Sequence, residues 1–137
     1  MIRFLVGYAG AALVFCALDA CWLTLTNASL YRPALAPLLA EQVRLVPAVL
    51  FYVVYLAGVT LFAVLPAARA RRWLTAAGLG AAFGFVAYAT YDLTNQATLK
   101  LWATRITLLD LSWGVVATAA GATAGYIAIK LARLRPS

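Results

Sequence analysis

Four long apolar stretches dominate the pattern of this chain and predict four membrane-spanning helices. They cover residues 4–27, 45–65, 73–95 and 106–129. Each is about 20 residues or longer, enough to cross ~30 Å of hydrocarbon at ~1.5 Å per helical residue. The alternation of apolar and polar residues expected in strands of a membrane barrel is absent. The sequence therefore predicts an all-α integral membrane protein, a four-transmembrane-helix bundle forming one domain over residues 1–137.

The composition supports this class and excludes a small soluble domain. Of the 137 residues, 66% are hydrophobic and 11% are charged, and the mean hydropathy is +0.92. A folded chain of ~150 residues still leaves about 30% of its unfolded surface exposed. A soluble protein of this size would therefore expose much of that apolar surface to water.

The positive charges in the short connections predict the orientation of the bundle. The side that holds both termini carries seven of them, against four on the other side. Because basic loops stay in the cytoplasm, this bias predicts cytoplasmic N- and C-termini. The basic residues are split between two faces, which favours attraction to membrane lipids over nucleic-acid binding. The first side holds Arg3, Arg69, Arg71, Arg72, Lys130, Arg133 and Arg135, and the second holds Arg32, Arg44, Lys100 and Arg105.

Three of the four acidic residues, Asp19, Asp92 and Asp110, lie inside the apolar stretches. A carboxylate at mid-membrane costs about 2.5 to 3.5 kcal/mol on insertion scales, so each needs a partner or a task. Helix order and length place all three carboxyl groups in one layer near the outer surface. Helical spacing turns these side chains toward the bundle interior, and Phe85 is predicted to lie on the same inward face of its helix. The predicted ligand-binding residues of this layer are Asp19, Trp22, Tyr88, Tyr91, Asp92, Asn95, Asp110 and Trp113.

A purely structural interpretation of the same residues stays open. The carboxylates pair in that case with cations near the outer surface, namely Arg32, Arg44, Lys100 and Arg105, while Trp N–H groups complete the hydrogen bonds. The tryptophans also suit an interfacial aromatic belt. Tyr52 and Tyr55 are interpreted as packing or lipid contacts. The pairs Gly80-x-x-x-Gly84 and Gly121-x-x-x-Gly125 allow close helix packing, within one chain or in a homodimer.

Several kinds of chemistry are excluded by what the chain lacks. It contains no histidine, which excludes serine–histidine and cysteine–histidine nucleophiles and the usual haem ligand. Cys16 and Cys21 are spaced five apart on one helix, so they point in different directions and suit neither a redox pair nor a metal clasp. Aspartate oxygens that hold Mg²⁺ or Ca²⁺ on a lipid diphosphate remain an alternative, as does a carboxyl that donates a proton to an apolar substrate. No metal, cofactor or catalytic residue is assigned.

The segment 88–102 is the densest polar and aromatic stretch of the chain. Together with Leu18-Asp19-x-x-Trp22 and Asp110-x-x-Trp113-Gly114, it resembles the small bacterial membrane family called domain of unknown function 2177. The resemblance extends over nearly the whole chain, and residues 91–95 are its most specific element. Residues 100–103 depart from the Gly-Trp-Pro-like turn expected in that family. The resemblance implies a four-helix fold and a bacterial inner membrane, but no established activity.

Three classes of function fit these observations. The first is an acidic, aromatic-lined pocket near the outer surface that binds or modifies a lipid or isoprenoid-like molecule. The second is an accessory subunit of a larger membrane complex. The third is a small ion- or proton-coupled transporter, although transport sites usually lie nearer the midplane. The sequence favours the first and leaves the other two open.

Overall fold

A computed structural model describes residues 1–132, and helices form almost all of this part. No strand occurs within it, so the predicted all-α class is confirmed. Arg133 and Arg135, which contribute to the predicted charge bias, lie outside the described residues. The elements in order are α1 (Ile2–Thr26), the π-helix η1 (Asn27–Tyr31), α2 (Arg32–Leu35), the 3₁₀-helix η2 (Ala36–Leu38), α3 (Leu45–Val59), the π-helix η3 (Thr60–Val64), α4 (Leu65–Ala70), α5 (Trp73–Thr98) and α6 (Thr104–Leu131).

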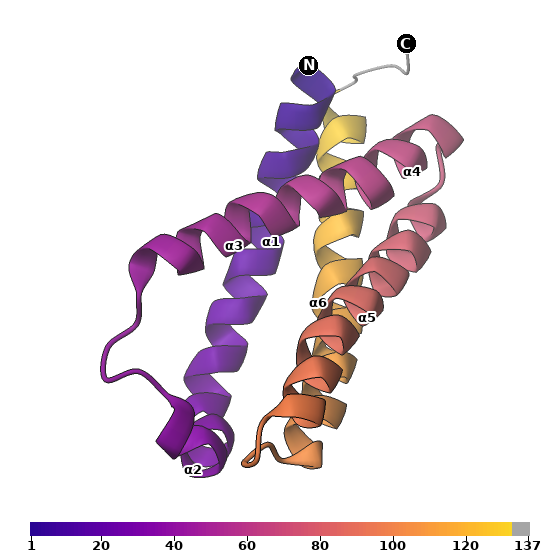
Figure 1. Cartoon of the computed structure of the whole chain (residues 1–137). Helices are drawn as coiled ribbons and strands as arrows, with labels where there is room; N and C mark the ends of the chain where they lie inside the picture. The colour runs from indigo at the N-terminus through magenta and orange to yellow at the C-terminus, as the bar shows by residue number, and fades with distance from the viewer. Residues whose placement is uncertain (133–137) are drawn as a thin grey trace.

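These elements join into four helical runs, each long and apolar enough to cross a membrane. The first run extends from Ile2 to Leu38, well beyond residue 27, where the hydropathy pattern places the end of the span. The other runs are Leu45–Ala70, Trp73–Thr98 and Thr104–Leu131. The N-terminus and the end of α6 lie at the same end of the bundle (Figure 1). The limits of the membrane spans and the orientation in the membrane stay predictions.

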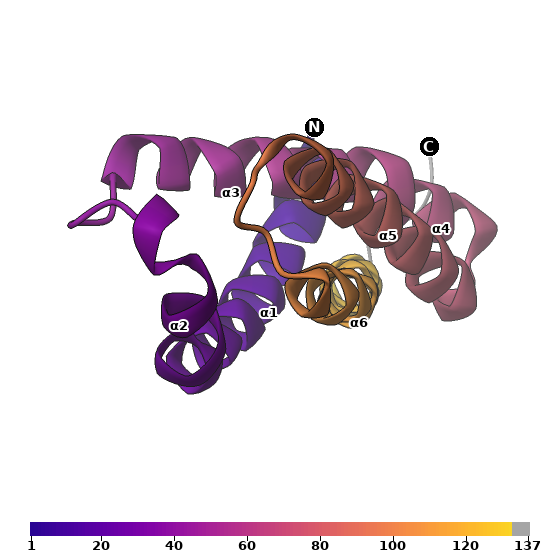
Figure 2. The same ribbon diagram turned by 60° about the horizontal axis from the view of Figure 1, so that its bottom comes forward.

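Helix α6 forms the centre of the bundle because it packs against both α1 and α5. The run from α3 to α4 crosses these three helices obliquely: α3 begins part-way along the bundle, and α4 ends near the chain termini (Figures 1 and 2). The first half of α3 is covered by few neighbours, and its apolar residues Leu45, Val46 and Val49 are exposed. The oblique course of α3 positions the pocket described below.

Small residues bring the helices close together. A Cβ added to Gly84 on α5 would collide with the backbone oxygen of Gly114 on α6, and a Cβ added to Gly125 on α6 would come within 2.6 Å of the backbone oxygen of Gly7 on α1. Close backbone approach through glycine is the usual basis of tight helix packing in membranes. Both glycine pairs noted in the sequence therefore serve contacts within the chain.

The inward face of α5 differs from the predicted one at Phe85. The buried residues of α5 are Ala76, Gly80, Gly84 and Asp92, which recur at intervals of four or eight. Phe85 is 50% exposed, because the close contact at Gly84 fixes which face meets α6 and the next residue turns away by about 100°. Phe85 thus belongs to the lipid-facing side, and its predicted place in the inward stripe is wrong.

The two π-helical segments share a position relative to proline. η1 ends at Tyr31, two residues before Pro33, and η3 ends at Val64, two residues before Pro66. Proline lacks an N–H and its ring clashes with the carbonyl four residues earlier, so a helix must adjust locally to continue through it. In this chain the adjustment is a π turn, and the helical path continues instead of breaking at either proline.

Candidate functional site

The three aspartates lie on three different helices and are almost completely buried. Asp19 on α1 is 7% exposed, Asp92 on α5 is fully buried, and Asp110 on α6 is 8% exposed. Buried carboxyl groups need hydrogen-bond donors or positive charge nearby. The donors to Asp19 and Asp110 are aromatic side chains.

Asp19 joins three helices through two hydrogen bonds. The hydroxyl of Tyr52 on α3 donates to its Oδ2 at 2.5 Å, and the indole Nε1 of Trp113 on α6 donates to its Oδ1 at 3.3 Å. Tyr52 also packs against the apolar core, so its interpretation as a packing residue holds, and its hydroxyl is in addition a polar partner of the site. The bond ties the oblique α3 to α1 at the level of the aspartates.

Asp110 receives its hydrogen bond from Tyr31, the last residue of η1. The Nε1 of Trp22 donates to the Tyr31 hydroxyl at 2.9 Å. Because an indole N–H only donates, the Tyr31 hydroxyl must accept it, and its own proton points to Asp110. The rings of Trp22 and Trp113 stack with centroids 4.6 Å apart and an interplanar angle of 7°. The stack connects the Asp110 network to the Asp19 network.

Tyr31 is held in place by a small apolar cluster at the α2 end of the bundle. Leu30, Leu35 and Ile106 are its buried members, and Tyr31 and Trp102 pack against them. Sequence reasoning did not select Tyr31 as a site residue. The sequence feature that could have pointed to Tyr31 is Pro33, which follows the polar segment after the first span and indicates a local adjustment of the helix there.

Asp92 differs from the other two aspartates because neither of its carboxyl oxygens has a hydrogen-bond partner in the described chain.

The register of the antiparallel helices α5 and α6 shows which part of α6 Asp92 faces. A Cβ on Gly84 would lie 2.6 Å from Thr118 Oγ1, and Gln96 bonds to Thr104 at 3.0 Å and to Thr107 at 2.8 Å. Between these contacts, Asp92 lies opposite the turn of α6 that carries Asp110. The α5–α6 interface therefore brings two carboxyl groups to the same level.

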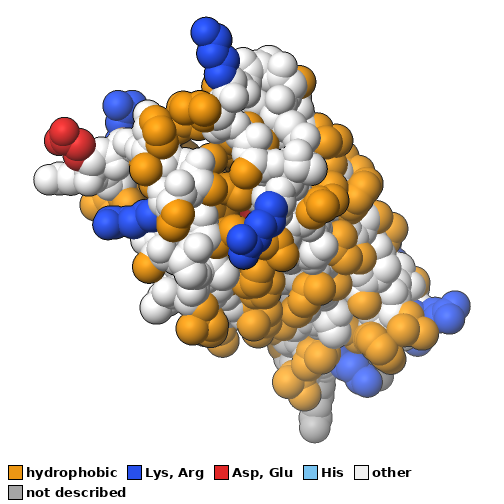
Figure 3. All heavy atoms as spheres, turned by 90° about the horizontal axis from the view of Figure 1, so that it is seen from below, with side chains coloured by type: hydrophobic (Ala, Val, Ile, Leu, Met, Phe, Trp, Pro, Cys, Tyr) orange, Lys and Arg blue, Asp and Glu red, His pale blue; other side chains and the backbone are white. Residues whose placement is uncertain are grey.

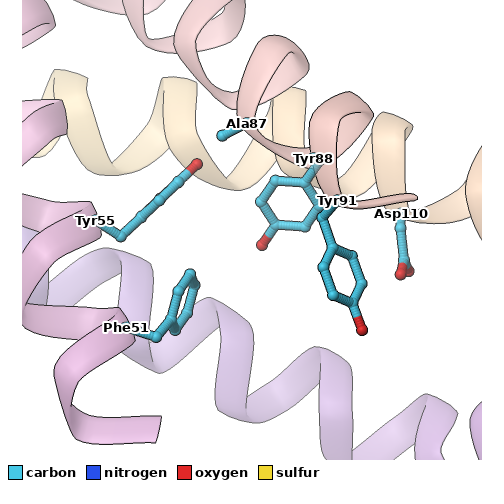
Figure 4. A pocket seen from close by; sticks show the side chains of 6 residues that line it. All are labelled: Phe51, Tyr55, Ala87, Tyr88, Tyr91 and Asp110. Carbon is cyan, nitrogen blue, oxygen red and sulfur yellow. The ribbon is translucent and has the colours of Figure 1, made fainter. Parts of the chain in front are cut away.

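Asp110 also lines a pocket of about 440 Å³. Figure 4 shows rings from α3 facing rings from α5 across the pocket, with the Asp110 carboxyl at one side. The Tyr55 hydroxyl shares a 2.6 Å hydrogen bond with Thr118 Oγ1 and so stays at the wall. The residues that line the pocket are Phe51, Tyr55, Ala87, Tyr88, Tyr91 and Asp110.

The predicted cationic partners lie at the surface. Arg32, Arg44, Lys100 and Arg105 are all exposed, and the hydrogen bonds described for Asp19 and Asp110 come from Tyr and Trp side chains. At the α2 end of the bundle, Lys and Arg side chains occupy several separate places among apolar ones (Figure 3). Charge pairing with the aspartates stays a prediction.

Two further properties bear on the chemistry of the site. Asn95, one turn beyond Asp92 on α5, is half-buried. Residues 1–132 contain no group of three or more His, Cys, Asp or Glu side chains that could hold a metal ion. The arrangement offers carboxyl oxygens and aromatic faces, which suit a ligand with a hydrogen-bond donor or a positive charge on an apolar body.

The bond between Tyr31 and Asp110 is expected to stabilise the bundle. Hydrogen bonds between membrane helices average about 0.6 kcal/mol and reach ~1.7 kcal/mol, so Tyr31→Phe should lower the free energy of unfolding by an amount in that range. A double-mutant cycle with Asp110→Ala, which removes the acceptor, isolates the coupling when measured by denaturant titration in detergent micelles. If the two substitutions add to within about 0.5 kcal/mol, the bond contributes nothing.

The family described as "Predicted membrane protein (DUF2177)" matches residues 4–127, which confirms the resemblance noted in the sequence. No curated protein and no solved structure matches the chain.

Proposed function

Because the chain belongs to this family of predicted membrane proteins, whose description assigns no activity, we propose a function from its own geometry. The pocket between α3, α5 and α6 binds a lipid or isoprenoid-like molecule, with the apolar body against the aromatic rings and the polar group at Asp110. The observation that carries this proposal is the combination, inside a membrane-spanning bundle, of four aromatic walls and one carboxyl group around a single cavity.

The size and lining of the cavity support an amphipathic ligand. Small-molecule sites enclose ~300 to 1,000 Å³ and combine mostly apolar walls with few polar groups, and the cavity of about 440 Å³ falls in this range. Asp110 Oδ1 accepts a hydrogen bond from Tyr31, but a carboxyl group has further acceptor positions. A ligand hydroxyl or amine can therefore donate to Asp110 without displacing Tyr31.

The exposure of the lining residues supports entry from the bilayer. Phe51 is 43% exposed and Tyr91 is 59% exposed, and both belong to helical runs that are candidate membrane spans. An apolar molecule dissolved in the bilayer reaches the cavity between these two side chains without crossing water. With both termini in the cytoplasm, as the charge bias predicts, the entrance lies in the outer half of the membrane.

The test is native mass spectrometry with lipid analysis on protein gently extracted from its own membrane. Wild-type protein should retain a stoichiometric lipid-like molecule. Asp110→Asn should lower its occupancy about fivefold, since a hydrogen bond to a charged group contributes about 1 kcal/mol more than one to the neutral amide that replaces it. Glu41→Gln is the matched control, because it removes the one acidic side chain outside the predicted spans, in an exposed connection.

Two outcomes would contradict the proposal. Retention of the same molecule by Asp110→Asn at wild-type occupancy would mean that the Asp110 carboxyl group does not bind the ligand. Wild-type protein that carries no such molecule but reproducibly retains a second protein would favour the accessory-subunit alternative instead.

A further inference from the structure

At the opposite end of the bundle, Arg3 on α1 is half-buried, but part of its guanidinium group is cut off from solvent. Its Nε and Nη2 atoms are inaccessible to solvent, and neither has a hydrogen-bond partner in the described chain. A guanidinium group carries five N–H donors and is always charged. Leaving two of its nitrogens buried without an acceptor is costly, so this position requires a negatively charged or strongly accepting group.

Arg3 also lines a cavity of about 190 Å³. Its other lining residues are Met1, Phe4, Leu65 and Arg69, so two arginines and no acidic residue border one small space. Arg69 is also exposed to solvent. The arginines come from α1 and α4, which lie together at the end of the bundle that holds the chain termini (Figure 1).

No acidic side chain of this chain is placed to neutralise the pair. Asp19 lies about 24 Å further along α1, at ~1.5 Å per residue. Asp92 and Asp110 lie toward the α5–α6 connection, at the opposite end of the bundle, and Glu41 is exposed in the connection before α3. These are all four acidic residues of the sequence. No acidic side chain therefore supplies a counter-charge to Arg3 and Arg69, and a bound anion can do so.

We propose that the cavity between Arg3 and Arg69 binds a phosphate group. Guanidinium groups bind phosphate oxygens through paired, charge-assisted hydrogen bonds, and two of them around a small space match a tetrahedral oxyanion. Phe4 and Leu65 add an apolar border at a helix end, where phospholipid headgroups meet the hydrocarbon. This site is separate from the aspartate pocket, and neither proposal depends on the other.

The experiment is a titration of delipidated protein by native mass spectrometry with three probes: phosphatidylglycerol, diacylglycerol and inorganic phosphate. Phosphatidylglycerol should bind wild type, and diacylglycerol, which lacks the phosphate, should bind at least about tenfold more weakly. Arg3→Gln should weaken phosphatidylglycerol binding by a similar factor. Competition by millimolar inorganic phosphate would show that the site takes the free ion as well, and its absence would show that only the lipid headgroup is bound.

Arg72→Gln is the matched control, because it removes the same charge at the same end of the bundle but lines a different cavity. Equal weakening by Arg3→Gln and Arg72→Gln would mean general attraction to charge and would overturn the proposal. So would equal binding of phosphatidylglycerol and diacylglycerol, or no binding of either phosphate probe. Circular dichroism verifies the fold of each variant. Arg69→Gln replaces Arg3→Gln if the latter does not fold, with the same expected loss.

Discussion

Gly84→Ala is expected to destabilise the bundle more than any other single-methyl change on α5. The added Cβ would collide with the backbone oxygen of Gly114 and lie 2.6 Å from Thr118 Oγ1. A backbone carbonyl inside a helix cannot rotate away, so α5 and α6 must separate along their main contact. Overpacking of this kind costs about 1 to 3 kcal/mol. The free energy of unfolding, measured by denaturant titration in micelles, should fall by at least about 1 kcal/mol.

Gly78→Ala is the matched control for this prediction. Gly78 lies on the same helix, and an added Cβ there meets nothing within 4 Å. Alanine favours helix over glycine by up to ~1 kcal/mol, so this variant should be as stable as wild type or slightly more stable. If Gly84→Ala and Gly78→Ala unfold alike, the close approach of α5 and α6 does not exist in the folded protein.

The same contact connects stability with the candidate site. The register that Gly84 sets against α6 continues through Tyr88 to Asp92, which brings Asp92 to the level of Asp110. A Cβ at Gly114 would run into the Tyr88 ring, so this pocket wall also depends on a glycine. Loosening the α5–α6 contact is therefore expected to change the pocket as well as the stability.

Much of the fold could be predicted from hydropathy and glycine spacing alone. The number of helices follows from the length of each apolar stretch, and the contacts of Gly84 and Gly125 follow from small residues that recur every four positions. The oblique course of α3 could not be predicted, because an apolar stretch shows that a helix can span the membrane but not how it tilts. The π turns before Pro33 and Pro66 also depend on local geometry that hydropathy does not carry.

The acidic residues of the site and a Trp N–H donor could be predicted from the sequence, but the tyrosine donors could not. Asp19, Asp92 and Asp110 could be placed in one layer because helix length fixes depth. Tyr31 and Tyr52 could not be identified as their partners, because a tyrosine near a span end has the same pattern as an interfacial anchor. A neutral hydroxyl or indole N–H satisfies a buried carboxyl group without bringing a second charge into the membrane. The Tyr and Trp donors to Asp19 and Asp110 have this property.

Ala87→Trp is expected to abolish ligand binding in the pocket while leaving every carboxyl group in place. Ala87 lines the cavity between the aromatic walls, as Figure 4 shows. A tryptophan side chain at this position projects into the space that the proposal assigns to the apolar body of the ligand. Occupancy of the retained molecule in native mass spectra should fall at least about tenfold, because burial of an apolar body contributes ~25 cal/mol per Å² and the blocked ligand loses most of it.

Ala82→Trp is the matched control on the same helix. Ala82 is exposed and does not line the pocket, so the same side chain there should leave occupancy near the wild-type value. Both variants should unfold at similar denaturant concentrations, since Ala87 borders a cavity with room for the ring. A ligand that survives Ala87→Trp but is lost in Asp110→Asn would place its apolar body outside the cavity, against the bilayer-facing side of α3.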